Sequence, residues 1–289
     1  MGSANWWVGK VSLADKTAIV TGAGRGIGRA VAVILAKEGA NMVAVDVEHL
    51  PSSSNQYGDS VLKGYQAALE LVEQIDTMHR RAIAVNADVT RSNQVASMVK
   101  KALDEYGGID ILVNSAGVIT SANVVDLSED QWDLVMNVNA KGTFLCCKAV
   151  APYMMRNKSG KIVNISSESG KTGEKGLAHY CASKFAVIGF TQSLAMELAP
   201  YNINVNAVCP GMVYTKMWDY LLRAEDTAYL VTKENAKPLD DKFERLANEI
   251  VPLGRAQTPD DIARTVLFLC LSDNITGESI NVTGGHEMH

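Results

Sequence analysis

Short apolar runs alternate with longer amphipathic segments along most of this chain. The runs are nearly continuous in Val, Ile, Leu and Ala, as in Ile109–Val113, a pattern typical of strands that are buried on both faces of a parallel sheet. The sequence therefore predicts strands at Thr17–Thr21, Met42–Asp46, Ala82–Asn86, Ile109–Asn114, Lys161–Ser166, Asn202–Cys209 and Ser279–Val282.

Between these runs, apolar residues recur every three or four positions, which indicates helices. Regular alternation of strands and helices favours one doubly wound, Rossmann-like α/β domain over residues 1–289, with a central parallel sheet and helices on both faces. We find no linker, repeat or low-complexity tract in the sequence. The predicted helices are Ile27–Glu38, Val61–Met78, Ser92–Tyr106, Glu129–Met155, Ala178–Leu198 and Pro259–Leu271.

Two stretches interrupt this alternation. Glu48–Gly64 contains a Pro and three consecutive Ser residues and is interpreted as a surface loop. Lys216–Ile250 carries helical patches with several aromatic residues, among them Trp218 and Phe243. Because long insertions in compact domains are often functional, we expect a helical substrate lid at about 213–250.

Composition excludes several classes of function. The chain is 47% hydrophobic and 20% charged with a net charge of −5, and it has no long basic run, so nucleic-acid binding has no support. It has no apolar stretch of the length that a membrane helix needs. The 5 cysteines include no Cys-x-x-Cys pair and predict free thiols in a reducing compartment. We expect a cytoplasmic protein without a metal.

A glycine-rich segment, Thr21–Gly28, follows the first predicted strand and opens the first predicted helix. Glycines let the backbone turn tightly and approach phosphates, and the helix N-terminus adds partial positive charge. This context predicts a dinucleotide site. Its candidate residues are Gly22, Gly24, Arg25, Gly26, Ile27 and Gly28.

Asp46 ends the second predicted strand, 20 residues beyond Gly26. A carboxylate here accepts hydrogen bonds from ribose hydroxyls and repels a 2′-phosphate, so we expect NAD, with NADP less favoured. Arg25 argues weakly for NADP, because a guanidinium binds phosphate well. The ends of the next two strands are expected to contact adenine and ribose through Asp88, Val89, Asn114, Ala116 and Gly117.

Tyr180 and Lys184 are four residues apart on a predicted helix and therefore share a face. A nearby cation favours the phenolate, so we expect a lowered pKa for Tyr180 and a role in acid–base catalysis. Because Tyr229 and Lys233 have the same spacing, the spacing alone carries little weight.

The order of the motifs resembles the single-domain branch of the short-chain dehydrogenase/reductase family. The resemblance extends from about Leu13 to Gly285 and excludes Tyr229 and Lys233, which are interpreted as structural. The matching pieces are Thr21–Gly28, Asp46, Asp88, Asn114–Gly117, Asn139, Ser167, Tyr180 with Lys184, and Pro210–Gly211.

This resemblance implies a role for each catalytic residue. Ser167 is expected to polarise the substrate carbonyl, and Tyr180 to donate or accept the proton. Lys184 is expected to lower the pKa of Tyr180 and to hold the nicotinamide ribose, while Asn139 holds a water that relays protons. The implied contacts on the nicotinamide, which carries the hydride, are Pro210, Gly211, Val213 and Thr215.

The substrate is expected to be a small-molecule secondary alcohol or ketone. Cys209–Trp218 and Gly173–Gly176 resemble polyol, acetoin and butanediol dehydrogenases of the family, which implies a polyol, a diol or a small hydroxyketone. Polar residues near the predicted pocket, including Glu168 and Ser169, suit such a substrate. The aromatic residues of the predicted lid suit a more apolar alcohol equally well.

Two alternatives remain open. The first is a 3-oxoacyl-(acyl-carrier-protein) reductase, in which Arg156, Lys158 and Lys161 meet an acidic carrier; Asp46 and the enlarged lid argue against it. The second is a non-catalytic NAD(H)-binding protein, which has no need of the intact catalytic set. The resemblance also implies a homotetramer, or a homodimer, formed through the two longest predicted helices.

Overall fold

A seven-stranded parallel sheet forms the centre of the molecule, with strand order β3-β2-β1-β4-β5-β6-β7. The structure is a computed structural model, and it describes residues 13–48, 63–222 and 239–289. The expected Rossmann-like domain with helices on both faces is confirmed. The strands are β1 (Thr17–Thr21), β2 (Asn41–Asp46), β3 (Ala82–Asn86), β4 (Ile111–Asn114), β5 (Gly160–Ile165), β6 (Ile203–Pro210) and β7 (Ser279–Val282).

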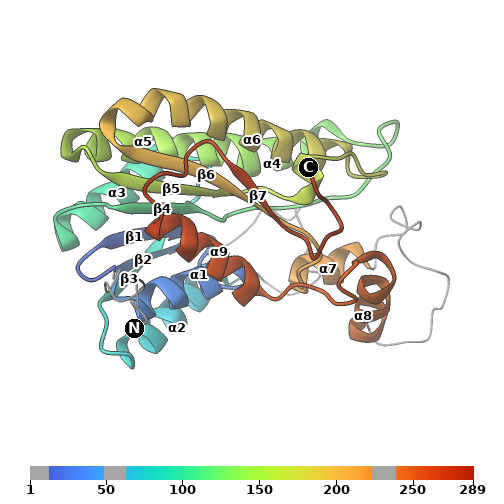
Figure 1. Cartoon of the computed structure of the whole chain (residues 1–289), viewed down its shortest axis with the longest axis horizontal. Helices are drawn as coiled ribbons and strands as arrows, with labels where there is room; N and C mark the ends of the chain where they lie inside the picture. The colour runs from blue at the N-terminus through green and yellow to red at the C-terminus, as the bar shows by residue number, and fades with distance from the viewer. Residues whose placement is uncertain (1–12, 49–62, 223–238) are drawn as a thin grey trace, which may run out of the picture.

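Helices cover the sheet in two layers (Figure 1). Because side chains alternate across a strand, neighbouring residues enter different cores. On β1, Ile19 belongs to the core beneath one helical layer, whereas Ala18 and Val20 belong to the core beneath the other. The layer over Ile19 consists of α3 (Ser92–Tyr106), α5 (Gly142–Asn157) and α6 (Ala178–Leu198), and the opposite layer of α1 (Gly26–Lys37), α2 (Gly64–Asp76) and α9 (Pro259–Leu271).

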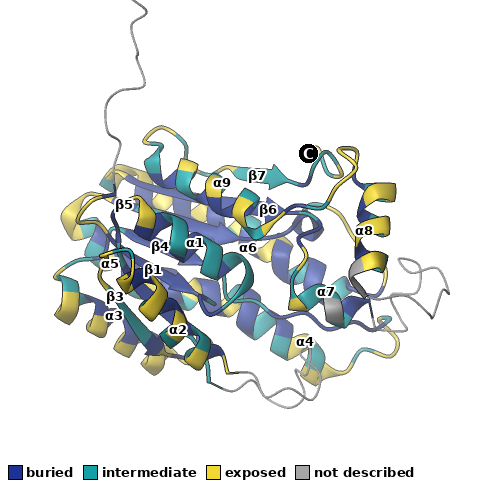
Figure 2. Ribbon diagram, turned by 90° about the horizontal axis from the view of Figure 1, so that it is seen from below, coloured by how far each residue is buried: buried dark blue, intermediate teal, exposed yellow. Residues whose placement is uncertain are grey.

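The central strands are buried, as Figure 2 shows by their dark blue colour. All residues of β1, β4 and β6 are buried. This burial explains why β1 and β4 read as continuous apolar runs rather than as alternating ones.

The predicted helix Glu129–Met155 is divided in the structure. A regular helix, α4 (Glu129–Val135), passes into a π-helical turn, η2 (Met136–Lys141), before α5 begins at Gly142. Ser128 and Gln131 form a reciprocal capping box at the start of α4. Such π-helical turns frequently occur at functional sites, and this one contains Asn139.

Two short helices, α7 (Lys216–Leu221) and α8 (Leu239–Ile250), occupy the ends of the predicted lid. Phe243 of α8 packs against Tyr214 and Trp218, with ring centroids 4.8 Å and 5.2 Å apart. Residues 223–238 of that lid, which include Tyr229 and Lys233, lie outside the described residues. So do residues 49–62 of the predicted loop.

All five cysteines are buried and unpaired, which confirms the expectation of free thiols. Within the described ranges, no helix has the length and apolar character needed to cross a bilayer.

Phe144 on α5 and Phe185 on α6 are 41% and 47% exposed. Self-association through these helices stays a prediction.

Candidate functional site

A cavity of about 570 Å³ lies at the carboxyl ends of the parallel strands. This edge is where open α/β sheets bind their ligands. The segments after β1, β2, β3, β4, β5 and β6 all contribute to its wall. Every residue of the predicted catalytic and cofactor sets lines it except Gly24, Asn114 and Asn139.

The glycine-rich turn leaves the N-terminus of α1 facing this cavity. Gly26 has φ of +54°, a conformation that side chains disfavour. A Cβ on Gly28 would overlap the Gly22 carbonyl oxygen and lie 2.8 Å from the carbonyl carbon. The N-cap residue of α1, Arg25, makes no side-chain cap to the helix, so the first N–H groups of α1 suit a phosphate. The turn therefore fits the pyrophosphate of a dinucleotide.

Asp46 stands at the end of β2 and lines the cavity. Its Oδ2 accepts a hydrogen bond from the Gly24 amide at 2.9 Å, and its Oδ1 accepts one from the Val47 amide at 2.8 Å. Burial raises the pKa of this carboxyl, while the two amides and Arg25 oppose that rise. Gly24 thus binds the Asp46 carboxylate through its amide. It does not line the cavity itself.

Ser167, Tyr180 and Lys184 also line this cavity. Ser167 follows β5, whereas Tyr180 and Lys184 share one face of α6. The Ser167 hydroxyl favours the phenolate of Tyr180 as a hydrogen-bonding neighbour and so lowers the Tyr180 pKa. The Lys184 Nζ lies 5.6 Å from the centroid of the Tyr180 ring and donates to the Ile165 carbonyl at 3.0 Å. The three groups thus form one cluster.

The electrostatics of this cluster differ from the expectation. Burial raises the pKa of Tyr180, and the Ser167 hydrogen bond only partly opposes the rise. Burial also lowers the pKa of Lys184 to about 8. The expected lowering of the Tyr180 pKa is therefore not seen, because the loss of solvent outweighs the Ser167 hydrogen bond.

Two predicted asparagines lie behind the cavity wall instead of in it. The Asn139 amide is engaged by both backbone groups of Val118, at 2.9 and 3.0 Å, and by Ser183 Oγ at 3.0 Å. The Asn114 amide donates to Asn164 Oδ1 at 2.8 Å, between β4 and β5. Both side chains link elements that carry the site through hydrogen bonds. The water relay assigned to Asn139 stays a prediction.

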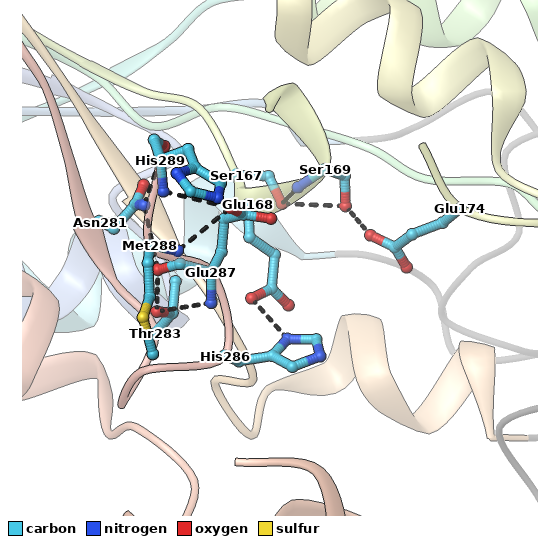
Figure 3. Close-up of polar contacts among 10 residues, drawn as sticks. All are labelled: Ser167, Glu168, Ser169, Glu174, Asn281, Thr283, His286, Glu287, Met288 and His289. Atoms are coloured by element: carbon cyan, nitrogen blue, oxygen red, sulfur yellow. Dashed lines mark hydrogen bonds and ion pairs between the residues drawn. The ribbon is translucent and has the colours of Figure 1, made fainter. Parts of the chain in front are cut away.

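A polar network absent from the predicted set reaches the cavity near Ser167 (Figure 3). Ser167 Oγ contacts Ser169 Oγ at 3.2 Å, and Ser169 in turn donates to Glu174. Glu168, which lines the cavity, pairs with His286 at 3.0 Å, and its burial raises the pKa of its carboxyl to about 6. His286 is 118 residues away along the chain, so local pattern contains no signal for this contact.

Comparison with known proteins places this chain in a family. Residues 16–226 match the family model described as short chain dehydrogenase. The chain is 36% identical to 3-oxoacyl-(acyl-carrier-protein) reductase FabG of Thermotoga maritima, covering 94% of this chain and 98% of the relative. It is 38% identical to the protein of that name from Staphylococcus aureus strain Mu50, over 94% and 98% of the two chains.

Solved structures agree with this assignment. Carveol dehydrogenase from Mycobacterium avium, in complex with NAD, superposes with a TM-score of 0.86 at 31% identity, over 95% of this chain and 98% of that one. The expected likeness to polyol, acetoin and butanediol dehydrogenases is wrong in its detail, because the curated relatives are named as 3-oxoacyl-(acyl-carrier-protein) reductases. The chain belongs to the short-chain dehydrogenase/reductase family.

Proposed function

We propose that this protein reduces the 3-oxo group of an acyl thioester to a 3-hydroxy group with a nicotinamide dinucleotide. The observation that carries the proposal is the name shared by relatives 36–38% identical over nearly the whole chain. The cluster of Ser167, Tyr180 and Lys184 in a cavity beside the glycine-rich turn supports a ketone reduction. The chemistry is the same at any ketone, so the support for an acyl thioester as substrate comes from the relatives.

The polyol, diol or hydroxyketone expected from the sequence is therefore corrected. That expectation rested on Cys209–Trp218 and Gly173–Gly176, two segments at the substrate end of the site. Agreement over two short segments is outweighed by agreement over more than nine-tenths of the chain with reductases of one name.

Each residue of the cluster of Ser167, Tyr180 and Lys184 has a separate role in the reduction. When bound, the nicotinamide supplies a hydride to the carbonyl carbon. The Tyr180 hydroxyl donates its proton to the carbonyl oxygen, and the raised pKa keeps this phenol protonated at neutral pH. Ser167 Oγ orients and polarises the same oxygen, while Lys184 holds the ribose beside it.

The substrate end of the cavity suits an acyl chain. The apolar surface of this cavity includes parts of Tyr214, Met217, Trp218 and Leu221. The expected carrier contacts need revision, because Lys161 Nζ is bound by Asn204 Oδ1 at 2.7 Å and Asp273 Oδ1 at 2.8 Å.

We further propose NAD(H) as the cofactor, because a 2′-phosphate would lie against the Asp46 carboxylate. Asp46→Ser is expected to raise the preference for NADPH over NADH by at least tenfold, about 1.4 kcal/mol. The ratio of the two kcat/KM values measures it. Asp46→Asn is the control, since it keeps an acceptor for the Gly24 amide without the charge. An unchanged ratio in both variants contradicts the role of the carboxylate.

A substrate panel tests the proposed function. Acetoacetyl thioesters, a sugar alcohol and acetoin are offered with NADH or NAD, and the cofactor absorbance is followed. We expect kcat/KM for the thioester to exceed the others by at least tenfold, because the apolar end of the cavity stabilises an acyl chain. The proposal is refuted if the protein oxidises the sugar alcohol efficiently and does not reduce the thioester.

A further inference from the structure

Gly64, the first residue of α2, packs directly against the Asp46 carboxylate at the end of β2. A Cβ on Gly64 would overlap Asp46 Oδ1, and it would lie 2.8 Å from Asp46 Cγ and 2.5 Å from the Val47 carbonyl oxygen. Glycine is the residue that permits so close an approach of one segment to another. Any other residue at this position therefore has to displace the carboxylate or the backbone beside it.

Gly24 contacts the same carboxylate from the glycine-rich turn. Its amide donates to Asp46 Oδ2 at 2.9 Å. A Cβ on Gly24 would lie 2.8 Å from that oxygen and 2.6 Å from the Gly64 carbonyl oxygen. Both glycines are buried, whereas Asp46 is only partly buried and lines the cavity. The two glycines thus enclose the carboxylate between α2 and the turn and leave part of it open to the cavity.

Hydrogen bonds fix the start of α2 relative to the glycine-rich turn and the end of β2. Arg29 Nη1 donates to the Gly24 carbonyl at 3.3 Å and to the Ala67 carbonyl at 3.2 Å. The Tyr65 amide donates to the Val47 carbonyl at 3.2 Å. Because these bonds hold α2 in place, the residue at its first position sets the space that is left for the carboxylate.

The place of the carboxylate matters for a dinucleotide in the cavity. An ionised carboxylate offers about four acceptor positions, and the amides of Gly24 and Val47 take one on each oxygen of Asp46. Acceptor positions therefore remain for ribose hydroxyls. Displacement of the carboxylate weakens such hydrogen bonds, because they depend steeply on distance and angle. It also reduces the repulsion of a 2′-phosphate, because that repulsion falls with distance.

We propose that Gly64 is a positioning residue for the cofactor: by leaving room for the Asp46 carboxylate, it places that carboxylate for the adenosine ribose and so sets the preference for NADH over NADPH. The inference rests on the proposed preference for NAD(H). It gives a role to the first residue of α2, which belongs neither to the glycine-rich segment nor to the strand that ends at Asp46.

Calorimetric titration of the protein with NADH and with NADPH, without substrate, tests the inference. Gly64→Ala is expected to lower the preference for NADH, taken as the ratio of the two Kd values, by about tenfold, which corresponds to one hydrogen bond to a charged group. Arg29→Met removes the donors that hold α2 and is expected to lower the ratio less. Gly108→Ala is the control, because a Cβ at Gly108 meets no atom within 4 Å.

The Asp46→Ser background separates positioning from loss of structure. In that background the added methyl group at position 64 has no carboxylate to displace, so Gly64→Ala is expected to change the ratio no further. A thermal melt of each variant records the cost to folding. Damage to the fold alone weakens the binding of both dinucleotides and leaves their ratio as it is in the wild type.

The inference is overturned if Asp46→Ser changes the ratio and Gly64→Ala does not, or if Gly64→Ala changes it equally with and without the carboxylate. Should Gly64→Ala fail to fold, an unchanged ratio in Arg29→Met overturns it. Failure of the proposed cofactor preference is seen separately, as an unchanged ratio in Asp46→Ser, and the inference fails with it. Failure of the thioester as substrate does not affect these titrations, because they contain no substrate.

Discussion

Replacement of Tyr180 by Phe is expected to lower kcat by roughly 10²–10⁴-fold, the contribution of a positioned general acid. The ring of Tyr180 belongs to the buried core beneath α6, and Phe preserves that packing while removing the only proton at this position. The fold and the glycine-rich turn stay intact, so NADH binding survives. Steady-state rates and NADH titration by tryptophan fluorescence measure the two effects separately.

Tyr153→Phe is the matched control. Tyr153 lies on α5 beneath the Arg156 guanidinium, 4.4 Å from its ring centroid, and is absent from the cavity wall. Its hydroxyl has no part in the reduction, so turnover is expected to stay at the wild-type rate. Full activity of Tyr180→Phe with its cofactor bound is the result that removes Tyr180 from the mechanism.

Replacement of Gly28 by Ala is expected to weaken cofactor binding by about 10- to 100-fold, since forcing a methyl group into a packed site costs roughly 1–3 kcal/mol. The added Cβ overlaps the Gly22 carbonyl oxygen, so the turn that faces the pyrophosphate must move. Isothermal titration with NADH gives the affinity, and a thermal melt of the protein without cofactor gives the cost to folding.

Gly108→Ala supplies the comparison for this variant, because a Cβ at Gly108 meets no atom within 4 Å. It is expected to bind NADH as the wild type does. Equal affinities in the two variants contradict the assignment of the turn as the phosphate site. A fall in melting temperature without a fall in affinity assigns Gly28 to stability alone.

The sequence by itself determined the fold and the location of the site. A continuous apolar run predicts β1, and helical periodicity predicts α3, with the bounds that the structure has. A continuous apolar run follows from burial of a strand on both faces, and helical periodicity follows from burial of a helix on one face. The spacing of Tyr180 and Lys184 also places them on one helix face, so both reach the cavity.

What only the tertiary structure decided depends on contacts between distant segments and on burial. The π-helical turn interrupts the predicted helix Glu129–Met155, and the Asn139 amide that it carries binds Val118 behind the cavity. Burial raises the pKa of Tyr180, whereas helical spacing alone predicts a fall. Glu168 meets His286 across 118 positions, a contact that no local pattern encodes, because only the folded sheet brings the C-terminal segment to the end of β5.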